Sequence, residues 1–315
     1  MLSTFLAELA TAPFALYHFQ RFQPLGVIGN MFTIPLVEMV AMPAGFIGLL
    51  ALPFGLDAPI WHFMGYGVSM MLALSHRVAE MPFASIVVPA LSPSTLLVVS
   101  AGMIIIFLMS TSLRWLGFIP IFIGCILAFM TNYPDLYIAR DGASLAARGP
   151  DGRLHVMGRG VNDFTVTQWL LADGDQRLLQ DESVKQGPLC TASGCVMRRT
   201  PEEIYILGLE RDALIDDCKL ASVLITPFYA PQQCAAAFVI DRDIVKKFGA
   251  VSLYRNDKAF PTDKVAEKYR LAVSRDPLKN RPWAPQIQGD EPLSLTQVTV
   301  QRAPADAEAE PLTPR

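Results

Sequence analysis

Cysteine supplies the most reactive side chains of this sequence, and four of the five cysteines lie between residues 190 and 234. If the part of the chain that carries them is exported, as argued below, an even number of cysteines favours two disulfides, with buried free thiols as the alternative. A zinc site of four thiolates needs two close pairs, and "CTASGC" followed by two isolated cysteines fits that spacing poorly. We therefore predict disulfides and no metal or other cofactor. The candidates are Cys190, Cys195, Cys218 and Cys234, and Cys190–Cys195 with Cys218–Cys234 is one of three possible pairings.

Glu38 is the one charged residue of an apolar stretch over residues 22–56. A carboxylate inside a membrane span is costly and usually faces a cavity or a partner. Asn30 and Pro35 lie in the same stretch, in which three prolines make a continuous helix unfavourable. We therefore treat Asn30, Pro35 and Glu38 as candidates for lining a channel. The alternative is that Glu38 lies at a helix break near the interface and reaches water there.

The common catalytic motifs are absent from this sequence. It has four histidines, no two of them at a metal-binding spacing, and no Walker loop, GxSxG elbow or GxGxxG occurs. Acidic residues such as Asp216, Asp217 and Asp241 are typical of helix starts and helix surfaces. We predict no catalytic residue from the sequence alone.

Charge is distributed very unevenly between the two parts of the chain. The 315 residues include 26 Lys and Arg and 29 Asp and Glu, but residues 1–134 carry only seven of these charges. A soluble domain averages about a quarter charged residues, so residues 1–134 are too apolar to be one. The sequence predicts a membrane module followed by a water-soluble domain.

Two uncharged stretches, residues 94–112 and 115–134, are each long enough to span a membrane and predict a tight antiparallel hairpin. Residues 22–56 predict one broken or kinked span. Residues 60–80 place aromatic side chains at one end and charges at the other, which favours a helix lying in the interface over a fourth span. Arg114 in the hairpin turn favours a cytoplasmic turn, which places residues 135–315 in a bacterial periplasm.

The predicted fold class is an α-helical membrane module over residues 1–134, with about three spans and one interfacial helix, followed by an α/β soluble domain. Asp-Gly turns between apolar alternations predict hairpin strands over residues 135–160. Strand, helix and strand units then follow, and we assign the α/β domain to residues 135–262. Residues 263–315 are rich in Pro, Ala and acidic residues, which predicts a poorly ordered tail.

Residues 9–36, "LATAPFALYHFQRFQPLGVIGNMFTIPL", resemble the competence segment of ComEC proteins, the inner-membrane channels of bacterial DNA uptake. Residues 134–170, "PDLYIARDGASLAARGPDGRLHVMGRGVNDFTVTQWL", resemble the C-terminal domain of the same family. The resemblance extends over nearly all of residues 1–255 and links both modules in the expected order. The matching positions of the first segment are Pro13, Tyr17-His18-Phe19, Leu25-Gly26, Asn30 and Pro35, and they add His18 to the channel candidates.

The resemblance implies a C-terminal domain with a degenerate metallo-β-lactamase-like fold. Nuclease activity in that fold needs an HxHxDH cluster, because two metal ions must clamp the attacking and leaving oxygens. This domain has a single histidine, His155, so we expect no enzymatic activity. Full-length members carry an N-terminal domain and further spans, so we expect this chain to be the C-terminal part of a split or truncated protein.

Two functions follow as hypotheses. The first is part of a multi-pass inner-membrane channel that takes up single-stranded DNA in natural transformation. It would contact lipids, the missing N-terminal part and other competence proteins. The second is a non-transporting, membrane-anchored periplasmic protein with a disulfide-stapled domain, acting as a scaffold or persisting as a remnant.

Overall fold

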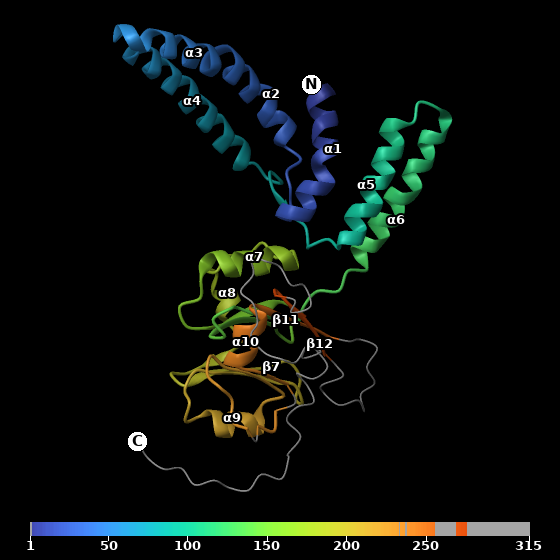
Figure 1. Cartoon of the computed structure of the whole chain (residues 1–315), viewed down its shortest axis with the longest axis vertical. Helices are drawn as coiled ribbons and strands as arrows, with labels where there is room; N and C mark the ends of the chain where they lie inside the picture. The colour runs from blue at the N-terminus through green and yellow to red at the C-terminus, as the bar shows by residue number, and fades with distance from the viewer. Residues whose placement is uncertain (1, 233, 237, 256–268, 276–315) are drawn as a thin grey trace. The chain divides into compact units, whose positions relative to one another are not determined.

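The computed structural model describes residues 2–232, 234–236, 238–255 and 269–275, and divides into two compact units (Figure 1). Unit 1 comprises residues 1–131 and 171–176, and unit 2 comprises residues 132–170 and 177–315. The boundary near residue 131 agrees with the predicted change from apolar to charged composition at residue 134.

Unit 1 is built almost entirely from helices. Its helical elements are α1 (Leu2–Phe19), α2 (Gly26–Leu36), the π-helical η1 (Val37–Ala41), α3 (Met42–Ala51), the 3-10 turn η2 (Leu52–Phe54), α4 (Ala58–Ala79), α5 (Pro93–Leu108), the 3-10 segment η3 (Ser112–Gly117) and α6 (Phe118–Phe129). Two short strands, β1 (Arg21–Phe22) and β2 (Ile86–Val87), pair antiparallel and join the chain after α1 to the chain before α5.

The predicted hairpin is confirmed as α5, η3 and α6 (Figure 1). Glycines set its close packing. A Cβ atom added to Gly102 would lie 2.6 Å from the carbonyl oxygen of Gly117, and one added to Gly117 would lie 2.5 Å from the carbonyl oxygen of Gly102. Small residues let helix backbones approach this closely, as at helix contacts within membranes.

The predicted broken span is a helix interrupted by a π-helical turn and ending in a 3-10 turn. From α2 to η2 the helix runs over Gly26–Phe54, and Pro35 lies just before the π-helical turn η1. Pro43 follows the π-helical turn closely, at the start of α3. Proline donates no backbone hydrogen bond and crowds the carbonyl group four residues before it, here that of Met39 in η1, which accounts for a local change in helical pitch. The prolines predicted that this helix is broken, without giving the position.

Helix α4 differs from the prediction of a helix lying alone in the interface. It packs lengthwise against α2 and α3, with Gly29 facing Val78 at one end and Gly48 facing Trp61 at the other. This antiparallel pairing holds α4 beside the broken helix. Helix α4 is not among the described helices that are long and apolar enough to cross a membrane, so the interfacial helix stays a prediction. The apolar face of residues 60–80 is used for that contact, which the sequence pattern did not reveal.

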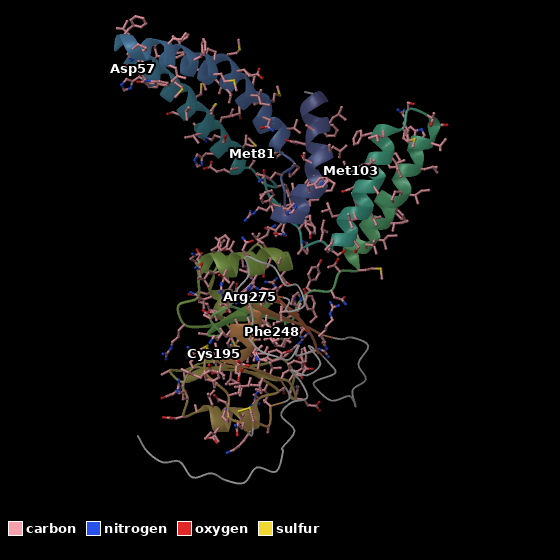
Figure 2. All side chains as sticks on the ribbon, in the orientation of Figure 1. Asp57, Met81, Met103, Cys195, Phe248 and Arg275 are labelled. Atoms are coloured by element: carbon pink, nitrogen blue, oxygen red, sulfur yellow. A yellow bond between two sulfur atoms is a disulfide. The ribbon has the colours of Figure 1, made fainter. Side chains whose placement is uncertain are left out.

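Two helices of unit 1 are long and apolar enough to cross a membrane, namely Gly26–Phe54 and Ser112–Phe129, and Pro93–Leu108 is a shorter apolar helix. Large apolar side chains project from these helices without cover (Figure 2), among them Phe46 at 67% and Phe122 at 68% exposure. Apolar surface of this extent marks an interaction with lipid or protein.

Unit 2 contains two five-stranded sheets. The first has the order β12-β11-β3-β4-β5 and is antiparallel throughout; the second has the order β10-β9-β8-β7-β6, with β8, β9 and β10 parallel. The strands of the first sheet are β3 (Leu136–Ile138), β4 (Ser144–Arg148), β5 (Leu154–Gly158), β11 (Val251–Arg255) and β12 (Tyr269–Val273). Those of the second are β6 (Leu189–Cys190), β7 (Gly194–Arg198), β8 (Ile204–Gly208), β9 (Val223–Ile225) and β10 (Phe238–Ile240).

The alternation of side chains along the strands places the core between the two sheets. Leu136 and Leu145 of the first sheet and Leu207 and Ile225 of the second belong to one buried cluster. The opposite faces are covered by helices, which are α7 (Asp163–Asp173) and α8 (Glu182–Lys185) on the first sheet and α9 (Leu214–Leu220) on the second. Helix α10 (Arg242–Phe248) contributes Val245 to the central core. The order of layers is helix, sheet, sheet, helix.

The predicted tail boundary at residue 262 is too early for one strand. Strand β12 pairs with β11 over its whole length, and its Tyr269 is buried in the central core. Its sequence, YRLAV, is mostly apolar but only five residues long, and as an edge strand it buries only Tyr269 fully. The remaining residues of the predicted tail, 263–268 and 276–315, lie outside the described residues.

Candidate functional site

Helices α1 and α2 meet at a polar contact that involves a predicted channel residue. The side-chain amide Nδ2 of Asn30 donates a hydrogen bond to Oε1 of Glu8 at 3.3 Å. Gly26, one helical turn before Asn30, makes room for the carboxylate, because a Cβ atom there would lie 2.8 Å from Oε1. An acid and an amide are thereby paired between two apolar helices, and Glu8 is a site residue that sequence reasoning missed.

Glu38 lies in the π-helical turn η1 and is exposed. It is eight residues beyond Asn30, which corresponds to about 12 Å along a helix axis. Turns of this type are frequent at functional sites, because the extra residue shifts side chains out of the regular helical register. In the described part of the chain, no hydrogen bond joins Glu38 to Asn30 or Glu8.

His18 lies in the last turn of α1, is exposed, and packs edge-on against the ring of Tyr17 at 4.9 Å between ring centroids. Pro35 lies within α2 just before the π-helical turn. Of the four channel candidates, the structure therefore places Asn30 with a new partner, Glu8, and Pro35 beside the turn that carries Glu38. His18 joins neither of these contacts in the described part of the chain.

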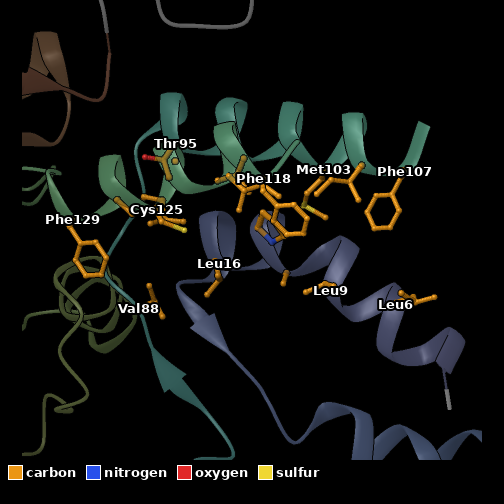
Figure 3. Close-up of a pocket in the computed structure, with 18 residues that line it drawn as sticks. Leu6, Leu9, Leu16, Val88, Thr95, Met103, Phe107, Phe118, Cys125 and Phe129 are labelled. Carbon is orange, nitrogen blue, oxygen red and sulfur yellow. The ribbon is translucent and has the colours of Figure 1, made fainter. Parts of the chain in front are cut away.

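A groove opens between α1, α5 and α6, and we refer to it as the α1–α5–α6 groove (Figure 3). Its volume is about 710 Å³, and its lining is almost wholly apolar. Leu6 and Phe107 lie toward one end, and Val88 and Phe129 lie toward the other. The unpaired Cys125 lies in its wall and is exposed.

The four cysteines of unit 2 form two pairs at disulfide distance. Cys190 and Cys195 face each other directly across β6 and β7, with Cα atoms 4.0 Å apart. Cys218 of α9 pairs with Cys234, with Cα atoms 5.0 Å apart. These are the pairs named in the sequence analysis as one of three possibilities.

A group of charged and polar residues lies buried at one edge of the two sheets. We call it the Asp135 cluster, and it comprises Asp135, Arg148, Arg199, Tyr205 and Tyr269. The Asp135 side chain is 5% exposed, and its Oδ1 atom lies 2.6 Å from Nη1 of Arg199 and 3.4 Å from Nε of Arg148. Arg148 also donates hydrogen bonds to the carbonyl oxygens of Pro134 and Gly152. One carboxylate therefore holds Arg148 of β4, in the first sheet, and Arg199, the residue after β7 of the second sheet.

Two tyrosines extend the Asp135 cluster into the core. The hydroxyl groups of Tyr205 and Tyr269 are 2.8 Å apart. Burial raises the pKa of both hydroxyls, and the neighbouring Tyr205 raises the pKa of Tyr269 further. Burial acts to lower the pKa of the Arg199 guanidinium, but the charge of Asp135 and a hydrogen bond to Tyr205 raise it overall. The cluster keeps Arg199 charged and both tyrosines neutral.

His155, the only histidine of unit 2, pairs with Asp151 at 2.9 Å between Nε2 and Oδ1. Burial acts to raise the pKa of Asp151, but the hydrogen bond from His155 and those from backbone N–H groups, such as that of Arg153, together hold that pKa below its usual value. Among the described residues, no group of three or more His, Cys, Asp or Glu side chains is arranged to hold a metal ion.

Comparison with known proteins gives one match. The family model described as "Competence protein" matches residues 1–113, which include α1 to α5, the Glu8–Asn30 contact and the π-helical turn. No curated protein and no solved structure matches the chain. The first third of the chain is thus similar to competence proteins, and this similarity supports a competence-type protein with a part in DNA uptake.

Proposed function

We propose that the chain forms part of an inner-membrane path for single-stranded DNA during natural transformation. The observation that carries the proposal is the match of residues 1–113 to the Competence protein family. The same residues hold the Glu8–Asn30 contact and Glu38 in a widened helical turn. Polar groups within apolar helices are costly and commonly mark transport paths.

The proposed placement is multi-pass in the inner membrane, with unit 2 in the periplasm. Two cysteine pairs at disulfide distance support it, because disulfides persist in oxidising compartments. A phosphatase fused after Ser274 should then be active, and a fluorescent protein fused there should be dark. The reverse pair of results would contradict the periplasmic placement.

For unit 2 we propose a non-catalytic role on a degenerate metallo-β-lactamase-like scaffold. Two packed sheets with helices on both outer faces support the scaffold assignment. The role is tested by incubating the purified chain with single- and double-stranded DNA and Mg²⁺, Mn²⁺ or Zn²⁺. Cleavage that is lost when His155 is replaced by Ala would contradict it.

Transport is tested by a transformation assay on a strain that lacks this gene and is complemented with the chain or its variants. Asn30→Leu removes the partner of Glu8 and should lower transformation at an unchanged protein level. Ser69→Ala is the matched control, because Ser69 bonds only within its own helix, to the carbonyl oxygen of Gly65.

The alternative, a membrane-anchored protein that transports nothing, is favoured by the low basic content of residues 1–134. These residues carry only three arginines and no lysine, whereas paths for single strands are lined by positive charge. Transformation that is unaffected by loss of the gene would establish this alternative and contradict the transport proposal. A strong defect in the deletion strain would exclude it.

A further inference from the structure

The length of the α1–α5–α6 groove corresponds to one leaflet of a membrane. Its lining runs from Leu6 to Leu16 on α1 and from Thr95 to Phe107 on α5. At about 1.5 Å per residue these segments are about 15 and 18 Å long. A bilayer has about 30 Å of hydrocarbon, so one leaflet contributes about 15 Å.

The groove is wide enough for an apolar ligand. A volume of about 710 Å³ spread over about 17 Å gives a cross-section of about 40 Å². Extended hydrocarbon chains are slender enough to lie in such a groove.

A positive charge lies in η3, the segment that follows α5 and leads into Phe118 of the groove lining. Phe118 of the lining stacks on Trp115 with ring centroids 5.6 Å apart, and the guanidinium of Arg114 lies 5.4 Å from the centre of the Trp115 ring. Both residues belong to η3, the segment that joins the two helices lining the groove. Tryptophan and arginine prefer the headgroup level of a bilayer, where the phosphates of lipids lie. Among the described residues, no carboxylate forms an ion pair with Arg114.

We propose that the α1–α5–α6 groove binds one phospholipid, with its acyl chains along the groove and its phosphate at Arg114. This inference rests on the proposed membrane placement of unit 1. The lining offers the ligand almost no hydrogen-bonding group, because Thr95 is buried and its hydroxyl is paired with that of Ser92. Apolar contact holds the chains, and the single arginine fixes which end carries the headgroup.

The test uses the full chain in vesicles of phosphatidylethanolamine and phosphatidylglycerol, with a small fraction of phosphatidylglycerol that carries a photoreactive diazirine in one acyl chain. After illumination, mass spectrometry maps the cross-links. We expect labelling at Met103 and Cys125 in the groove to persist when unlabelled phospholipid dilutes the vesicles just before illumination. Labelling at Leu97, which is 69% exposed and outside the groove, should fall with dilution because bulk lipid exchanges quickly.

Two matched variants locate the site. Ala128→Phe fills the groove and should lower labelling at Met103 about tenfold, the change expected when about 1.4 kcal/mol of binding is lost. Ala101→Phe adds the same bulk at an exposed position of α5 outside the groove lining and should leave that labelling unchanged. Ala12→Phe fills the groove from α1 and serves if Ala128→Phe does not accumulate. In native mass spectrometry, Arg114→Gln should lose the retained phospholipid, and Arg114→Lys should keep it.

Each remaining outcome is decisive. Labelling at Met103 and Cys125 that dilutes in parallel with Leu97 means bulk lipid only and overturns the proposal. Absence of label in the groove, with Leu97 labelled, means that protein covers it and also overturns the proposal. Absence of label at all three positions, with the chain missing from the membrane fraction, contradicts the membrane placement itself.

Discussion

Replacing Asp135 by Asn should destabilise unit 2 far more than a typical loss of an ion pair. Asn keeps the shape of the side chain but removes the charge that faces Arg199 at 2.6 Å and Arg148 at 3.4 Å. Their side chains are 17% and 16% exposed, so water replaces little of the lost interaction. Removing one partner of a buried pair costs about 3–5 kcal/mol.

The lower end of that range applies here. Arg148 keeps two backbone carbonyl partners, so most of the penalty falls on Arg199. We expect a loss of about 3 kcal/mol, which at a denaturant dependence of about 2 kcal/mol per molar lowers the urea midpoint by about 1.5 M. The measurement is pulse proteolysis of the full chain in detergent across a urea series, with survival of unit 2 as the readout.

Asp216→Asn is the matched control. Its partner Lys219 lies at 2.9 Å, but the two side chains are 80% and 67% exposed. An exposed pair contributes up to about 1 kcal/mol, so the midpoint should move by less than about 0.5 M. Equal midpoints for the two variants would refute the importance assigned to the Asp135 cluster. Asp135→Leu combined with Arg199→Met should recover much of the stability, because the charge of Arg199 is removed with that of Asp135 and Arg148 keeps its two carbonyl partners.

Four further outcomes are expected. Before reduction, an alkylating mass tag should label Cys125 alone, and reduction should expose four more thiols. Replacing Cys218 should lower the free energy of unfolding by about 3 kcal/mol. Labelling of all five cysteines before reduction would contradict the disulfides. The pKa of Tyr205 is raised in the folded state, so stability should fall as the pH rises above about 10, and less so in Tyr205→Phe; a flat urea midpoint between pH 9 and 11 would count against this. Glu38→Gln should impair DNA uptake at an unchanged protein level if Glu38 faces a wet path, and unchanged uptake would favour an interfacial acid. Gly102→Leu should separate α5 from α6, measured as faster proteolysis of the hairpin, whereas Gly65→Leu meets open space and should not; equal proteolysis of the two would show that the glycine contact is dispensable.

Local patterns predicted much of the fold. The Asp141-Gly142 turn predicted the β3–β4 hairpin, because Gly142 adopts a φ of +67° that other residues avoid. Pro35, Pro43 and Pro53 predicted a broken helix over residues 22–56, since each proline removes a hydrogen bond from the helical turn before it. Both signals lie within a few residues of the feature that they specify.

Contacts between distant residues were the ones that the sequence did not reveal. Glu8 and Asn30 are 22 residues apart, and Asp135 and Arg199 belong to different sheets, so no local spacing links them. Strand β12 was missed because its five residues, YRLAV, stand between charged residues and pair with β11, from which the intervening chain separates them. The site residues that depend on tertiary packing therefore needed the structure, whereas the cysteines and the helix break did not.

The interleaved order of the first sheet has a consequence for biogenesis. Strands β3 to β5 come early in unit 2, but β11 and β12 are made only after the whole second sheet, so β3 has an open edge until they arrive. Pairing across so long a stretch of chain raises contact order and slows folding. A chain that reached the far side of a membrane beginning with β3 would expose that edge during translocation. Truncation before Val251 should leave it open permanently and favour edge-to-edge aggregation.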